Sequence, residues 1–187
     1  METFVLDIMN VIEFEELENV VLVGHSYGAR SINGVVDRVP ERVKRLIYFD
    51  GGLAPSGTSR LDSMPRSERE KRVQSSLDWD GGISVPPPPA ETFGIMDHTI
   101  SSRVNRLMTP QPLNVEQTAV TLNNPIGNGR PATYIKCTDP ALPVVQPSAE
   151  YAKSRLDWRY LELPAGHDVI LTHPEQVAHI LLAESAI

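Results

Sequence analysis

The sequence predicts an α/β fold, with a mostly parallel sheet that helices cover on both faces. Nearly continuous apolar runs at residues 20–24, 43–50 and 132–137 are typical of strands that are buried on both faces. Helical patterns separate these runs, so we expect crossover connections and parallel strands. The length of 187 residues fits one domain that is large enough to bury a core.

The first fifty residues predict a helix followed by a strand–helix–strand unit. Apolar residues recur every three or four positions over residues 3–18, which indicates an amphipathic helix. The strand at 20–24 precedes a helix over 27–38, and a turn that begins at Pro40 leads to the strand at 43–50.

Residues 51–130 differ from the rest in composition. Glycines and prolines interrupt this segment, and Pro86–Pro89 form a stiff polyproline stretch. We therefore expect one domain with a core at about 1–55 and 130–187 and an inserted lid at about 56–129. Six apolar side chains of the lid either face a substrate pocket or pack on the surface of the lid itself: Trp79, Phe93, Ile95, Met96, Leu107 and Met108.

Regular structure returns after the lid. A third strand at 132–137 is followed by a helix from Ser148 to about Leu156, in which Ser148 is a suitable N-cap. A fourth strand occupies 158–163, and Thr172 can form a capping box at the start of the final helix.

Composition excludes several classes of partner. A net charge of −7 and a pI near 5.2 argue against nucleic acid, which a basic surface would bind. No apolar run is long enough to span a membrane, and the amino terminus lacks the pattern of a secretory signal. The single cysteine, Cys137, excludes an internal disulfide and is consistent with a reducing compartment. We expect a cytoplasmic protein with no nucleic acid or membrane partner.

The motif Gly-His-Ser-Tyr-Gly at residues 24–28 directly follows the first apolar run. A G-x-S-x-G motif between a strand and a helix is typical of a nucleophile elbow, a strained turn that exposes the serine Oγ above the sheet. Gly24 and Gly28 meet the need for small residues where the two backbones approach. The alternative is a helix-start serine in a nucleotide-type turn. The motif predicts Ser26 as a nucleophile.

A serine nucleophile needs a base and an acid that orients the base. His167 lies in a loop after the last strand, at the same end of the sheet as Ser26, and follows it in the chain. It is therefore the predicted base, and we expect the ring of His25 to point away from the serine Oγ. The remaining histidines belong to the lid or the final helix: His98, His173 and His179.

Two aspartates are candidates for the acid. Asp50 ends the second strand and Asp139 follows the third, so both lie at the correct edge of the sheet, although either could merely cap a turn. Asp168 adjoins His167, and neighbouring side chains in a loop seldom face each other. No residues have the spacing of a metal site or a phosphate-binding loop, so we expect no metal and no cofactor.

Four segments resemble the α/β-hydrolase superfamily, and in particular its compact branch of plant methyl esterases, hydroxynitrile lyases and bacterial relatives: residues 20–29, 45–55, 132–139 and 161–174. The resemblance implies that Ser26 is the nucleophile, that His167 is the base, and that the backbone N–H of Tyr27 is one donor of an oxyanion hole.

Two departures from this branch refine the prediction. The plant enzymes carry their acid after the third strand, where this chain has Pro140, and they have a small apolar residue where this chain has Asp50. Asp50 is therefore favoured over Asp139 as the acid. The lyases have a lysine after the histidine, and Asp168 at that position argues against hydroxynitrile cleavage.

Complete members of the superfamily have roughly 250 residues. The resemblance implies that the first strands, and the loop with the second oxyanion donor, have no counterpart before Ser26. The strand at 20–24 would then be an unprotected edge. We expect the chain to pair with a second copy through this edge, or to be a fragment of a longer protein.

The predicted function is a serine hydrolase that cleaves small carboxylic esters through an acyl-enzyme. The alternative is a catalytically silent or incomplete module of the same fold that binds a small apolar ligand or a partner.

Overall fold

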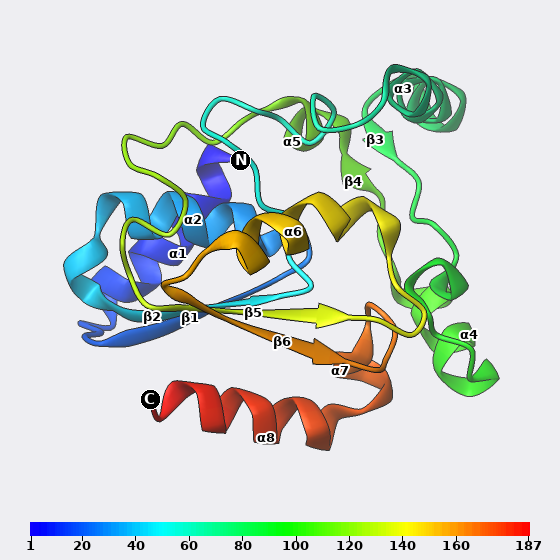
Figure 1. Cartoon of the computed structure of the whole chain (residues 1–187). Helices are drawn as coiled ribbons and strands as arrows, with labels where there is room; N and C mark the ends of the chain where they lie inside the picture. The colour runs from blue at the N-terminus through cyan, green and yellow to red at the C-terminus, as the bar shows by residue number, and fades with distance from the viewer.

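The computed structural model describes residues 1–187 and contains a four-stranded parallel sheet (Figure 1). The strand order is β1 (Val20–His25), β2 (Val43–Phe49), β5 (Ala132–Cys137) and β6 (Trp158–Leu163), with β1 at one edge and β6 at the other. All three pairings are parallel. The predicted α/β fold class and the four predicted core strands are confirmed.

Helices cover both faces of the sheet (Figure 1). One layer contains α1 (Glu2–Phe14), α2 (Gly28–Arg38) and α6 (Gln146–Ser154). On the other side, α7 (Val169–Thr172) leads into α8 (Pro174–Ser185). A 3-10 turn at Pro40–Arg42 joins α2 to β2. None of these helices has the length and hydropathy of a membrane span.

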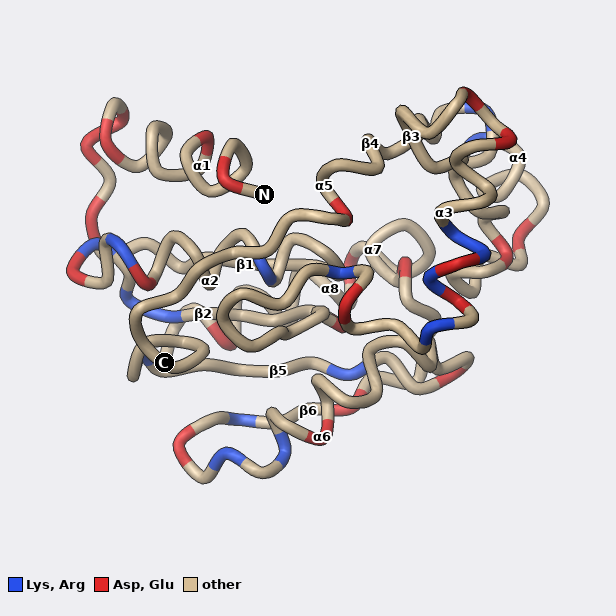
Figure 2. Tube along the Cα trace, turned by 90° about the horizontal axis from the view of Figure 1, so that it is seen from above, with Lys and Arg blue, Asp and Glu red and all other residues tan.

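The segment between β2 and β5 contains α3 (Arg66–Asp80), β3 (Ser84–Val85), a 3-10 turn (Ala90–Phe93), α4 (His98–Leu107), β4 (Gln111–Pro112) and α5 (Leu113–Gln117). The part of the chain with α3, β3, β4 and α4 lies beyond the carboxyl ends of the strands, whereas residues 118–131 return over α2 to the start of β5 (Figure 1). Strands β3 and β4 form a separate antiparallel pair. Acidic and basic residues alternate along α3, as expected of a solvated helix (Figure 2).

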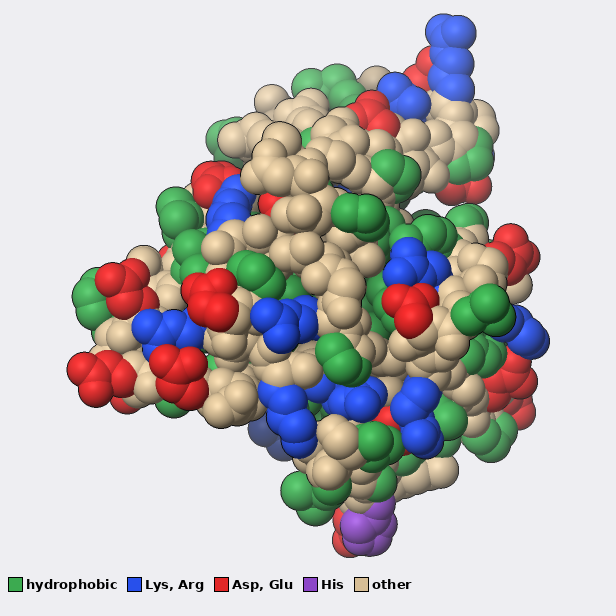
Figure 3. Space-filling view, turned by 60° about the vertical axis from the view of Figure 1, so that its left-hand side comes forward, with side chains coloured by type: hydrophobic (Ala, Val, Ile, Leu, Met, Phe, Trp, Pro, Cys, Tyr) green, Lys and Arg blue, Asp and Glu red, His purple; other side chains and the backbone are tan.

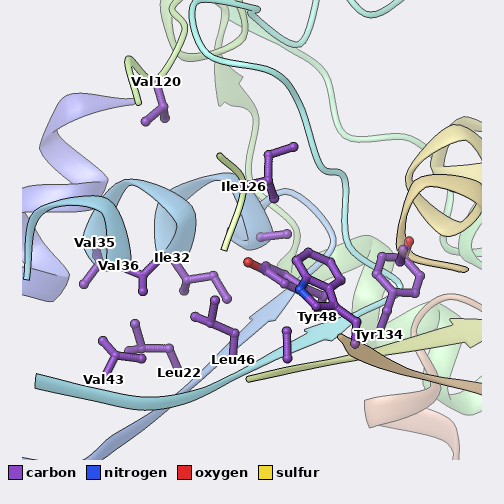
Figure 4. Close-up of a cluster of buried hydrophobic side chains, with 14 of the residues drawn as sticks. Leu22, Ile32, Val35, Val36, Val43, Leu46, Tyr48, Val120, Ile126 and Tyr134 are labelled. Carbon is purple, nitrogen blue, oxygen red and sulfur yellow. The ribbon is translucent and has the colours of Figure 1, made fainter. Parts of the chain in front are cut away.

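The core has two parts because side chains of the central strands alternate between the two faces. Figure 4 shows the larger cluster, in which α2 contributes Ile32, Val35 and Val36 and the strands contribute Leu22, Val43, Leu46, Tyr48 and Tyr134. On the opposite face, Ile47 and Phe49 of β2 pack with Val169 and Val177 beneath the sheet. Each such large apolar side chain stabilises the fold by roughly 1.5–3 kcal/mol on burial.

Three predicted helix ends are wrong. Helix α1 ends at Phe14, before Glu16 adopts a φ of 51° that no helix continues through. Helix α6 begins at Gln146, and the hydroxyl of Ser148 instead accepts the N–H of Leu53 at 2.9 Å. Helix α8 has no side-chain cap, because the hydroxyl of Thr172 bonds to the ring of His173.

The surface mixes charge types. On the face shown in Figure 3, acidic and basic side chains are interspersed with apolar ones. Several basic side chains gather below the middle of this face, whereas the acidic ones gather mainly at its left edge.

Candidate active site

Ser26 stands in a sharp turn between β1 and α2. Its φ of 52° is in the left-handed region, which is sterically costly for a non-glycine residue. The turn is fixed from both sides, because Ser26 N–H donates to the carbonyl of Phe49 at 3.1 Å and Gly52 N–H donates to the Ser26 carbonyl at 2.9 Å. This local geometry matches the nucleophile elbow that the motif predicts.

The two glycines of the motif differ in importance. A Cβ on Gly24 would lie 2.8 Å from the Cα of Ala29, so the close approach of β1 and α2 excludes any side chain there. A Cβ on Gly28 would meet nothing within 4 Å. The expectation that Gly28 must be small is therefore wrong, because the helix turns away from the strand at that position.

Asp50 directly follows β2, the strand beside β1. Its φ is 43°, again in the left-handed region, and its N–H donates to the carbonyl of Ile135 at 2.7 Å. The residue is fully buried. Since β1 and β2 are parallel neighbours, Asp50 and Ser26 emerge from the same end of the sheet.

His167 connects these two residues. It lies in the loop between β6 and α7 and is 2% exposed. Its Nδ1 is 2.6 Å from Oδ2 of Asp50, and its Nε2 is 2.8 Å from Oγ of Ser26. The structure thus brings together Ser26, His167 and Asp50 in one hydrogen-bonded row.

The chemistry of the row decides which atom carries the proton. An ionised carboxylate can only accept, so Nδ1–H of His167 donates to Asp50. The Nε2 atom then has a free lone pair and accepts the hydroxyl proton of Ser26. In this tautomer the imidazole can take a proton from the serine.

The alternative acid does not reach the histidine. Asp139 is exposed, and its backbone N–H donates to the carbonyl of Ala165 at 3.1 Å. Of the two aspartates at this edge of the sheet, only Asp50 bonds to His167. His98, His173 and His179 are all exposed.

His25 has a structural contact that the sequence did not reveal. Its Nε2–H donates to the backbone carbonyl of His167 at 3.0 Å, and the two rings are 4.6 Å apart between centroids. Burial, and next the repulsion of a charged His167, lower the pKa of His25 from its ordinary value. A neutral His25 therefore holds the loop of His167 in place. No sequence signal identifies this contact, because it joins residues 142 positions apart.

The ligating atoms of His25, His167 and Asp168 lie within 4.8 Å of one another. Both ring nitrogens of His167 already have partners, Ser26 and Asp50, so binding a metal ion would break the row. The residues fit a hydrogen-bond network better than a metal centre.

The backbone N–H of Tyr27 follows the serine at the start of the turn before α2. It donates to no carbonyl, whereas the phenol of Tyr27 donates to the carbonyl of Val115 at 2.8 Å. An unpaired N–H beside a reactive oxygen is a suitable donor for a developing negative charge.

The lid reaches His167 and its neighbour Asp168 through one short segment. The ring of Phe93 lies 5.7 Å from that of His167, and the carbonyl of Phe93 accepts the N–H of Asp168 at 3.2 Å. A Cβ on Gly94 would lie 2.8 Å from the Cα of Gly166, so the two loops touch backbone to backbone.

The other apolar residues named for the lid differ in burial. Ile95 is buried, whereas Trp79, Met96 and Leu107 are exposed. Trp79 borders a hollow over α3 that includes none of Ser26, Asp50 and His167. Among the six predicted residues, Phe93 is the one whose ring packs on the ring of His167. The lid also has a small buried apolar cluster of its own: Leu61, Val85 and Leu113.

Comparison with known proteins places the chain in a family. A family model described as "Alpha/beta hydrolase family" matches residues 2–180. The chain is 31% identical over 196 residues to the carbendazim hydrolyzing esterase of Nocardioides sp. (strain SG-4G). The alignment covers 98% of this chain and 78% of that protein.

Solved structures have the same fold. An extracellular α/β-hydrolase from a Paenibacillus species, described as a structural and functional homologue of tobacco salicylic acid binding protein 2, has a TM-score of 0.79 at 22% identity, covering 96% of this chain and 77% of that one. A mutant of polyneuridine aldehyde esterase has a TM-score of 0.70 at 17% identity, covering 97% and 78%. The expected cytoplasmic location stays a prediction. The chain therefore belongs to the α/β hydrolase family, as shown by the match over residues 2–180 and by the curated relative, and its elbow between β1 and α2 is consistent with this.

Proposed function

We propose that this protein is a carboxylic ester hydrolase that works through an acyl-enzyme on Ser26. The observation that carries the proposal is the row in which His167 is 2.8 Å from the serine Oγ and 2.6 Å from Asp50. The similarity to a curated esterase supports the same reaction class.

In the first half-reaction, Oγ of Ser26 attacks the ester carbonyl carbon and its proton passes to Nε2 of His167. Asp50 holds the ring in this orientation and stabilises the imidazolium that forms. The N–H of Tyr27 donates to the oxyanion. The imidazolium then gives its proton to the departing alcohol, which leaves the acyl group on the serine.

In the second half-reaction, a water molecule attacks the acyl carbon and passes its proton to His167. The carboxylic acid departs, and the proton returns to Ser26. No step needs a metal or a cofactor. The substrate class we propose is small carboxylic esters.

Intact mass after incubation with a fluorophosphonate probe tests the nucleophile. We expect a single adduct on the folded wild-type protein and none on Ser26→Ala. Turnover of p-nitrophenyl acetate, small methyl esters and carbendazim then tests the substrate class, with Ser26→Ala lowering kcat by on the order of 10⁶-fold.

A folded wild-type protein without an adduct would contradict the proposal and favour a silent binding module. Turnover that persists in Ser26→Ala would contradict the role of this serine.

A further inference from the structure

A buried lysine lies directly behind the row of Ser26, His167 and Asp50. Lys136 belongs to β5, and its side chain is 4% exposed. Lysines are almost never buried without a partner. The partner here is Asp50, whose Oδ1 accepts from Nζ of Lys136 at 3.1 Å.

The carboxylate of Asp50 divides its two oxygens between different donors. Oδ2 accepts from His167, and Oδ1 accepts from both Lys136 and the N–H of Cys137, each at 3.1 Å. Asp50 is the one residue to which the ammonium of Lys136 donates. Lys136 and His167 therefore bond to different oxygens of the same buried carboxylate, that of Asp50.

The other groups around this carboxylate carry no compensating positive charge. Burial, and then the charge of Asp50, raise the pKa of the Cys137 thiol to about 12 and raise the pKa of Tyr134. Burial likewise raises the pKa of Tyr160, which stacks on Tyr134.

On the other side, His167 faces Ser26, the ring of His25 and its own neighbour Asp168. Burial lowers the pKa of His25, which keeps it neutral, and Asp168 lies 3.8 Å from His25 Nε2. Lys136 is thus the one lysine or arginine side chain in contact with Asp50.

We infer that Lys136 is a positioning residue that fixes the Asp50 carboxylate and offsets part of its charge, and so sets the pH at which His167 acts as a base. The inference rests on the proposed function. A buried carboxylate without a counter-charge would stabilise the imidazolium strongly, and a protonated ring cannot accept the serine proton. The lysine weakens that stabilisation while it holds the carboxylate ionised and oriented.

The rate of fluorophosphonate labelling of Ser26 between pH 5 and 9 tests the inference. In Lys136→Met we expect the midpoint of the acidic limb to move upward by about one to two pH units, from the loss of one charge within about 8 Å of the ring at an effective dielectric constant of about 20. The matched control is Lys153→Met, which removes an exposed lysine 3.8 Å from Glu162 and should leave the midpoint unchanged. A purely structural role for Lys136 would lower the rate without moving the midpoint.

A second measurement uses the intact wild-type protein, in case Lys136→Met does not fold. The chain has four lysines, and the inference requires one slowly exchanging ammonium in ¹⁵N-detected NMR throughout pH 5–9. That signal should shift or vanish in Asp50→Asn. A lysine spectrum without such an ammonium, or one insensitive to Asp50→Asn, would overturn the inference.

The outcomes separate the two proposals. A folded wild-type protein that fails to label would overturn the proposed function, and this inference with it. Normal wild-type labelling with an unmoved midpoint in Lys136→Met would overturn the role of the lysine alone.

Discussion

Two non-glycine residues with positive φ meet at one histidine. Ser26 and Asp50 have φ values of 52° and 43°, and each follows the last residue of a parallel strand. Such conformations cost about 1–3 kcal/mol each and persist where the surroundings enforce them. Here the enforcing groups are the backbone bonds from Ser26 to Phe49 and from Asp50 to Ile135.

The choice of acid gives the first prediction at this scale. Asp50→Asn should lower kcat by about 10⁴-fold, because the amide favours the wrong tautomer of His167. Asp139→Asn removes the same charge at an exposed position and should change kcat by less than about threefold. Ester turnover by the two purified variants measures the difference. Equal losses would refute the assignment of Asp50.

A second prediction concerns pH and stability. The pKa of His25 is lowered below its ordinary 6.5 by burial and by His167, so the unfolded chain binds a proton more tightly than the folded protein. The stability that neutral His25 contributes is present above pH 6.5 and is lost as the pH falls through the lowered pKa.

Urea unfolding at pH 7.5 and pH 5.0 should show a smaller pH dependence for His25→Asn than for wild type. His98→Asn, at an exposed site, should unfold with the pH dependence of the wild type. A His25→Asn variant that keeps the full wild-type slope would contradict the burial argument.

At the scale of elements, the contact of β1 with α2 determines whether the elbow can form. Gly24 lies where the strand and Ala29 of the helix touch, and Gly51 of the neighbouring loop packs on the same alanine. Helix α1 approaches α2 in a similar way, since a Cβ on Gly34 would lie 2.6 Å from Val5. The tight turn at Ser26 thus depends on the close packing of α2 against β1 and against the loop after β2.

Gly24→Ala should lower the free energy of unfolding by roughly 1–3 kcal/mol, because the backbone of α2 would have to move. Gly28→Ala is the matched control and should change it by less than about 1 kcal/mol, as its Cβ meets open space. Urea denaturation of both variants measures this. A similar decrease in the free energy of unfolding at both positions would contradict the argument that the close approach of β1 and α2 excludes a side chain at Gly24.

At the scale of the whole molecule, the sheet has a free edge at β1. Val23 of this strand is 43% exposed, and nearby α1 exposes Val11 and Phe14. An exposed apolar edge strand is a template for pairing with another chain. A two-fold axis would pair two copies of β1 antiparallel.

We predict that the protein forms a dimer through this edge, measured by size-exclusion chromatography with light scattering. Val23→Lys should shift the equilibrium toward monomer, because a charge on the edge opposes pairing. Val144→Lys, at a residue 50% exposed and remote from β1 in the chain, is the control. A wild-type protein that stays monomeric at high concentration would refute the prediction.

The sequence by itself determined the fold class, the core strands and the position of the tight turn that carries Ser26. The nearly continuous apolar runs at 20–24 and 132–137 are typical of buried strands, and the G-x-S-x-G motif between a strand and a helix is a local signal. The placement of His167 also followed from chain order and from the geometry of parallel strands.

Only the tertiary structure decided which aspartate bonds to His167, that Lys136 bonds to Asp50, and that His25 bonds to the carbonyl of His167. These are pairings across 86 to 142 positions, and no local pattern specifies them. The start of α6 also depends on tertiary contacts, because the hydroxyl of Ser148 accepts the N–H of Leu53 instead of capping the helix. Local periodicity fixes which residues are buried, whereas the partners of buried polar groups depend on which strand ends meet in space.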